Sequence, residues 1–169
     1  MKRKIKPITT PIIFLLFTLI GFACSDFTSN NSYRPPDNLY KVSIAQGVWG
    51  NVWFWEGDFM PSTDDFSNGR ITAVEREIYV HKATADSMVV PQHGTFHTEI
   101  NSNLIAVIHS DEDGFFQITL QPGKYSFFVK EGSKFYANSS DSEGYILSAK
   151  VEDNKVTKRQ IDITYKAVY

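Results

Sequence analysis

Two groups of residues in this chain have side chains that could bind a metal ion. His93 and His97 are four residues apart, a spacing that would put both rings on one face of a helix. Gly94 and the strand-like residues around it argue against a helix, and on a strand the two rings would lie about 13 Å apart, too far for one ion. Asp111 and Asp113 lie in an acidic turn whose oxygens could bind calcium, although the run lacks the spacing of an EF-hand. We prefer surface histidines and a solvated turn, so these four residues are weak candidates and no cofactor is predicted.

The sequence contains no motif for covalent or phosphate chemistry. It has no Gly-x-Ser-x-Gly segment and no glycine-rich phosphate loop, and nothing in it places two carboxylates across a cleft. The chain is therefore predicted not to be an enzyme. A site assembled from loops would show itself as a pocket with convergent titratable groups.

The single cysteine, Cys24, lies at the end of an apolar leader. Residues 2–6 are basic, residues 12–23 are apolar, and no charged residue lies between Lys6 and Asp26. A basic start followed by a short apolar run is typical of a secretory signal, and the run is short for a membrane span. We predict a signal peptide over residues 1–23.

The end of this leader, Gly21-Phe22-Ala23-Cys24, resembles a bacterial lipobox. Such a motif implies cleavage before Cys24 and acyl chains, such as palmitate, on that cysteine; two or three chains anchor a protein firmly. The expected location is the cell envelope, lipid-anchored at the outer membrane on its periplasmic or surface face. An uncleaved anchor or an incidental cysteine is the alternative.

The charge of the mature chain limits its partners. Without the four basic residues of the leader, 13 basic and 19 acidic residues remain, a net charge of −6. Nucleic acid binding needs a basic surface, so nucleic acid is excluded as a partner.

Two regions follow the leader. Residues 24–39 are polar, rich in Ser and Asn, and interrupted by Pro35-Pro36, which predicts a flexible tether. Residues 40–169 form the predicted domain. Its apolar residues often alternate with polar ones, and turn residues separate the alternating segments.

This pattern predicts an all-β fold, an antiparallel Greek-key β-sandwich of about seven strands with little helix. Longer loops are expected at residues 56–70, 83–96 and 131–144. The expected strands cover residues 47–55, 71–82, 104–109, 115–120, 124–130, 145–151 and 156–165.

One stretch resembles a known domain family. Residues 110–125, SDEDGFFQITLQPGKY, contain a polar turn ending in Gly, an aromatic-led strand, Pro-Gly and a Tyr that opens the next strand. This arrangement, with Gly50-Asn51-Val52 upstream, resembles carboxypeptidase regulatory-like domains. The resemblance covers residues 47–151 and implies a transthyretin-like, or prealbumin-like, seven-stranded sandwich. It says little about function.

Trp53 and Trp55 form the candidate binding surface. If Val52 and Phe54 point into the core, both tryptophans point outward from the same strand. Exposed aromatic side chains mark surfaces that bind sugars or proteins. The alternative is that residues 56–70 cover them, or that they form the core face themselves.

The first functional hypothesis is a lipid-anchored, non-catalytic β-sandwich that acts as a binding or structural module at the bacterial cell envelope. Its partners would be the membrane, through Cys24, and an envelope protein or a glycan. The alternative is a periplasmic metal-handling module that uses histidines and carboxylates. Asp86-Ser87-Met88 also resembles a short bacterial O-glycosylation acceptor, and whether Ser87 is glycosylated is left open.

Overall fold

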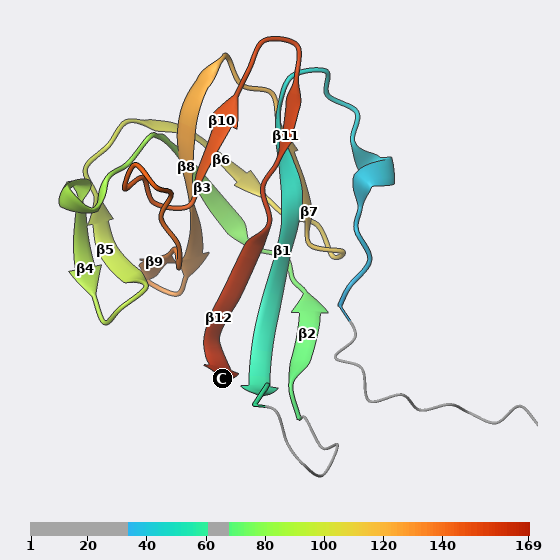
Figure 1. The fold of residues 1–169 in the computed structure, drawn as a ribbon, viewed down its shortest axis with the longest axis vertical. Coiled ribbons are helices and arrows are strands. Elements are labelled where there is room, and N and C mark those ends of the chain that lie inside the picture. The colour runs from blue at the N-terminus through green and yellow to red at the C-terminus, as the bar shows by residue number, and fades with distance from the viewer. Residues whose placement is uncertain (1–33, 61–67) are drawn as a thin grey trace, which may run out of the picture.

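The computed structural model describes residues 34–60 and 68–169. In these residues the chain is all-β, with twelve strands in two sheets and two 3-10 helices of three residues each, η1 (Leu39–Lys41) and η2 (Asp86–Met88). The predicted all-β sandwich is confirmed (Figure 1). No helix in the described part is long and apolar enough to span a membrane.

The five-stranded sheet is built around one long central strand, β1 (Gly47–Asp58). The first half of β1 pairs with β7 on one side and β11 on the other, and its second half pairs with β2 and β12. The pairings with β11 and β12 are parallel, although most others in the molecule are antiparallel. The partner strands are β2 (Arg70–Ala73), β7 (Phe115–Ile118), β11 (Val156–Lys158) and β12 (Ile161–Val168).

The seven-stranded sheet has the order β4-β5-β9-β8-β3-β6, and β10 also pairs with β8. Figure 1 shows this sheet behind β1 and β12, with β4 and β5 at one side of the molecule. Its strands are β3 (Glu77–Lys82), β4 (Val89–Gln92), β5 (Phe96–Ile100), β6 (Leu104–His109), β8 (Gly123–Glu131), β9 (Lys134–Tyr136) and β10 (Ser148–Val151).

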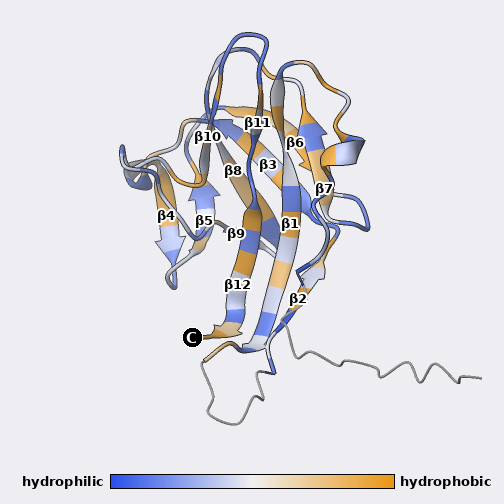
Figure 2. Cartoon of the chain, turned by 45° about the vertical axis from the view of Figure 1, so that its right-hand side comes forward, coloured by the Kyte–Doolittle hydropathy of each residue, from blue (hydrophilic) through white to orange (hydrophobic). Residues whose placement is uncertain are grey.

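The hydrophobic core lies where the two sheets face each other. Val48, Val52 and Phe54 of β1 belong to it, together with Phe127 and Val129 of β8. Hydrophobic and hydrophilic bands alternate along β1 (Figure 2), as a strand with one face on the core requires. The predicted inward direction of Val52 and Phe54 is correct.

Two predicted strands are divided in the structure. The stretch 156–165 divides into β11 and β12, which both pair with β1. The stretch 71–82 divides into β2 and β3, which belong to different sheets. The Ser110 hydroxyl causes this break locally: it accepts a hydrogen bond from the Arg76 amide and donates one to the Val74 carbonyl, both at 2.8 Å. A buried side chain thus replaces the strand partner of this segment.

Three strands have no counterpart among the predicted ones. β4 is in the predicted loop 83–96, β9 is in the predicted loop 131–144, and β5 begins at the last residue of the loop 83–96. β4 and β9 have only four and three residues, too few to show an alternating pattern. They are strands because they pair with β5 on its two sides, which only the tertiary fold provides.

Candidate functional site

The tryptophans on the outer face of β1 are mostly covered. Trp49 is 5% exposed and Trp53 is 8% exposed, and the Trp53 indole N–H has no hydrogen-bond partner among the described residues. The prediction that Trp53 is exposed is therefore wrong. β1 is buried on both faces over its first eight residues, because a second layer of chain lies on the side away from the core.

That second layer is residues 34–41, which we call the N-terminal strap. The Arg34 guanidinium lies 5.2 Å from the centre of the Trp55 ring, and the Asn38 amide donates to the Asn51 side chain at 2.8 Å. Since Trp53 lies between Asn51 and Trp55 on β1, the strap crosses the face at Trp53. The chain before η1 runs beside β1 and β7 in Figure 1.

The strap overlaps the predicted tether. In its described part, residues 34–39, Pro35 is buried and Asn38 is 1% exposed. Asp37 forms an ion pair with Lys158, and Asn38 also donates to the Asp113 carbonyl at 2.9 Å. This part of the predicted tether packs on the domain, and residues 24–33, including Cys24, lie outside the described residues.

Trp55 is only partly buried and begins an aromatic cluster at the end of β1. Its indole N–H donates to the Asp162 carboxylate at 3.0 Å, and its ring lies 5.1 Å from Phe59. The Phe59 ring in turn stacks on Tyr169 at 5.9 Å. Met60, Val168 and Tyr169 are 48%, 57% and 66% exposed. We call Trp55, Phe59, Met60, Val168 and Tyr169 the aromatic end.

The backbone and charged neighbours hold the aromatic end in place. The Phe59 amide donates to the Val168 carbonyl at 2.9 Å, which continues the pairing of β1 with β12. Arg70 forms an ion pair with Glu56 beside it. Flat apolar rings next to charged groups can bind the apolar face of a sugar and hydrogen-bond its hydroxyls.

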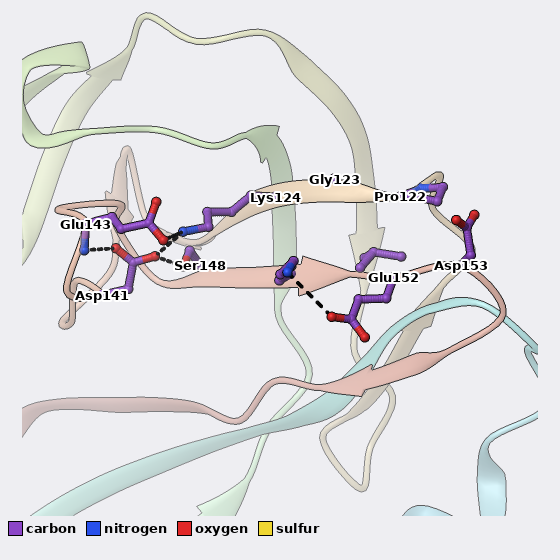
Figure 3. A pocket seen from close by; sticks show the side chains of 10 residues that line it. Pro122, Gly123, Lys124, Asp141, Glu143, Ser148, Glu152 and Asp153 are labelled. Atoms are coloured by element: carbon purple, nitrogen blue, oxygen red, sulfur yellow. Dashed lines mark hydrogen bonds and ion pairs between the residues drawn. The ribbon is translucent and has the colours of Figure 1, made fainter.

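A cavity of about 660 Å³ lies along β8 and β10 of the seven-stranded sheet, with Asp141 and Glu143 at one end and Pro122 and Asp153 at the other (Figure 3). The Lys124 ammonium contacts the Asp141 and Glu143 carboxylates at 3.0 and 2.8 Å, and the Ser148 hydroxyl donates to Asp141 at 2.6 Å. The hydrogen bond from Ser148 and those of two backbone amides hold the pKa of Asp141 well below its usual range. The contacts of Lys124 with the two carboxylates and of Ser148 with Asp141 fix the 141–148 segment.

The acidic turn of Asp111 and Asp113, considered above as a calcium site, forms ion pairs with a lysine. The Lys41 ammonium of the strap contacts Asp111 at 2.8 Å and Asp113 at 2.5 Å. The hydrogen bonds that the Lys41 ammonium donates to both carboxylates raise its pKa above the usual value. An ammonium group therefore occupies the position that a calcium ion would take.

The structure does not bring His93 and His97 into a metal site. His93 is exposed in a turn with a φ of 54°, whereas His97 is buried on β5. His97 and His81 contact Phe128 edge-on at 5.9 and 5.7 Å, and burial lowers the pKa of both rings. Within the described residues, no group of three or more His, Cys, Asp or Glu side chains could hold a metal ion.

Ser87 is exposed on η2, so a modifying enzyme could reach it. Whether it is glycosylated stays a prediction.

The chain matches no protein-family model, no curated protein and no solved structure.

Proposed function

We propose that the chain is a lipid-anchored, non-catalytic β-sandwich module that binds a glycan at the bacterial cell envelope. Lipid on Cys24, after cleavage of a signal peptide over residues 1–23, provides the anchor at the outer membrane. The kinship with carboxypeptidase regulatory-like domains, with their prealbumin-like topology, is part of this proposal and rests on residues 110–125.

The aromatic end carries the proposal for binding. It combines a 66% exposed tyrosine with two exposed apolar side chains, and β1 and β12 hold it rigidly. Contiguous exposed apolar side chains mark surfaces that bind a partner or ligand. The ring stack with the adjacent Asp162 carboxylate favours a glycan over a purely apolar partner, and the net charge of −6 favours a neutral glycan over an acidic one.

Glycan binding is tested with the lipidated chain in detergent on an array of bacterial envelope polysaccharides and peptidoglycan fragments. Tyr169→Ala should weaken binding of any retained glycan about tenfold or more, as loss of a central aromatic contact does. Tyr40→Ala is the matched control, since Tyr40 is 77% exposed but lies on the strap. Unchanged binding in Tyr169→Ala, or no glycan retained at all, contradicts the proposal.

Lipid anchorage is tested separately by growing cells with an alkyne fatty acid. The wild-type chain should incorporate the label and fractionate with membranes, and Cys24→Ala should do neither. A labelled Cys24→Ala chain, or an unlabelled wild-type chain, shows that another anchor operates.

A further inference from the structure

β6 is the last strand at one edge of the seven-stranded sheet. It pairs with β3, and no described strand pairs with its other side. Leu104, Ile105 and Val107 are 51%, 42% and 39% exposed, and every residue of the strand except His109 is apolar. An exposed hydrophobic edge strand is a template for pairing with another chain, and proteins usually protect such edges.

The opposite edge of the same sheet is protected. There β4 contains Pro91, which has no backbone N–H, and the pairing of β4 with β5 shifts register between Val90 and Pro91. β6 contains neither a proline nor a charged residue. Its one register shift, where Ile105 has no partner on β3, leaves residues 106–109 regular. Because one edge of this sheet is blocked and the other is left open, we expect the open edge to be occupied by another strand.

The backbone of β6 directs hydrogen-bonding groups to this open edge. The Ser110 amide donates to the Arg76 carbonyl at 2.9 Å, which continues the register of β3 and β6. Residues of an antiparallel ladder alternate between hydrogen-bonded and non-bonded pairs. Ile108 therefore bonds to β3, while the N–H and C=O groups of Val107 and His109 point away from it. Each of these two residues offers one donor and one acceptor to a further strand.

Charge favours a second copy of the chain as the occupant. Residues 24–169 carry a net charge of −6, yet residues 100–110 contain no Asp, Glu, Lys or Arg, so two copies can meet there without opposing like charges. In an antiparallel pairing about a twofold axis at Ile108, the two copies of Asp111 lie about 20 Å apart along the strands. That separation exceeds the Debye length of about 8 Å at physiological salt. A parallel pairing would place the two acidic turns side by side.

We propose that β6 pairs antiparallel with β6 of a second copy, so that the two seven-stranded sheets join across a twofold axis. With the axis at Ile108, Val107 of each copy lies opposite His109 of the other, and their outward N–H and C=O groups bond reciprocally. Such an interface uses up the open edge of both copies, and Pro91 blocks the other edge, so the assembly stops at a dimer. β6 shares no residue with the aromatic end, and the pairing does not depend on glycan binding.

The test places one reactive thiol at each edge and cross-links the full chain in the intact cells that make it. Val107→Cys and Val90→Cys are matched, since both valines lie on edge strands of the same sheet and are 39% and 42% exposed. A short bismaleimide spans the diagonal distance between the two copies of residue 107, about 7–8 Å. Val107→Cys should give at least tenfold more cross-linked dimer than Val90→Cys. The wild-type chain, treated in parallel, reports any contribution from Cys24.

A second pair of variants tests whether the backbone of β6 carries the pairing. His109→Pro removes the outward N–H, and an edge strand tolerates a proline whose N–H would face solvent. His109→Val keeps that N–H. In the Val107→Cys chain, His109→Pro should lower the yield of dimer tenfold or more, and His109→Val should leave it unchanged. An amide ¹H–¹⁵N spectrum of each purified chain in detergent micelles confirms that it is folded.

Four outcomes would overturn the proposal. Val107→Cys could give no cross-linked dimer, which would mean that the edge is open or covered by the chain itself. Its only adduct could have the mass of a different protein. Val90→Cys could cross-link to the same extent, or a folded His109→Pro chain could retain the full yield of dimer. Each of these results would show that β6 does not pair with β6 of a second copy.

Discussion

Two acidic turns in this molecule have nearly the same sequence and hydrogen bonds but different surroundings. One is Asp111 to Phe115 (DEDGF), and the other is Asp141 to Tyr145 (DSEGY). In each turn, one carboxylate oxygen of the first aspartate accepts hydrogen bonds from the backbone amides two and four residues later, at 2.9–3.0 Å. In each, the glycine has a positive φ, 75° at Gly114 and 81° at Gly144.

In each turn, a different lysine pairs with the two acidic side chains. Lys41 contacts both acidic side chains of the first turn and lies 5.9 Å from the Phe115 ring. Lys124 contacts both acidic side chains of the second and lies 4.7 Å from the Tyr145 ring. The repeated pattern therefore specifies a local unit: an aspartate that organises the turn, a glycine that permits it, and an aromatic ring under a cation.

The difference lies in what each unit contacts. The first turn packs against β1, where the Val52 amide donates to the Gly114 carbonyl at 2.8 Å, and its lysine comes from the strap, 70 residues away. The second turn projects toward solvent at Gly144, and its lysine is 17 residues away. The same local sequence thus connects distant elements in one place and stabilises its own loop in the other.

The largest expected difference between the turns comes from their glycines. A Cβ at Gly114 would lie 2.5 Å from the Val52 carbonyl oxygen, whereas a Cβ at Gly144 meets nothing within 4 Å. Gly144→Ala should cost about 1 kcal/mol, the penalty of a positive φ alone. Gly114→Ala should cost about 3 kcal/mol or more, since a backbone clash adds to that penalty. Urea unfolding measures both, and equal losses would contradict the packing of the first turn.

The second largest difference in stability is expected between the first aspartates of the two turns, Asp111 and Asp141. Asp141 accepts hydrogen bonds from Ser148 and Lys124 as well as from two amides, while Asp111 lacks a serine partner. The pKa of each carboxyl is lowered in the folded state. Each therefore contributes stability that is fully present above the unfolded pKa, about 4, and is lost as the pH falls below it.

Asp141→Asn should accordingly lower the urea midpoint at pH 7 more than Asp111→Asn does. It should also flatten the dependence of stability on pH between pH 5 and pH 2, because the titrating group is gone. Both variants are measured by urea unfolding at fixed pH values. A larger effect of Asp111→Asn would show that contact with β1, and not the number of hydrogen bonds, controls the strength of the turn.

The lysines should have the smallest effect on global stability, because their ion pairs are on the surface. Lys41→Met should instead loosen the strap over Trp53, which shifts tryptophan fluorescence to longer wavelength and speeds proteolysis of residues 34–41. Lys124→Met is the matched control and should change neither, since Lys124 does not contact the strap. The same fluorescence shift in both variants would indicate that Lys41 does not hold the strap.

The sequence predicted the first turn but not the second, although the signal was present. The first is the polar turn ending in Gly that is predicted within residues 110–125, between the expected strands 104–109 and 115–120. The pattern Asp-x-(Asp/Glu)-Gly-aromatic recurs at residues 141–145, inside the predicted loop 131–144. A search for internal repeats would have identified it. The short strands β4 and β9 gave no such signal, because three or four residues cannot establish a period.

The tryptophans of β1 show a second limit of prediction from sequence, which concerns solvent exposure. Alternation along β1 correctly placed Val52 and Phe54 in the core and the tryptophans on the other face. It could not show that the strap crosses this face, with Asn38 bonded to Asn51 and Arg34 over Trp55. Nothing in the local sequence connects residues 34–41 to β1. The exposed aromatic surface is therefore at the end of β1 and at Tyr169, and not at Trp53.

The sequence by itself determined the strand class, the direction of side chains along β1 and the position of a glycine turn, because these depend on periods of two and on backbone dihedral angles. Only the tertiary structure decided which aromatic rings reach solvent, which lysine pairs with each acidic turn, and that the His97 ring is buried against Phe128. Those outcomes depend on contacts between residues far apart in the chain, and a local pattern carries no information about such contacts.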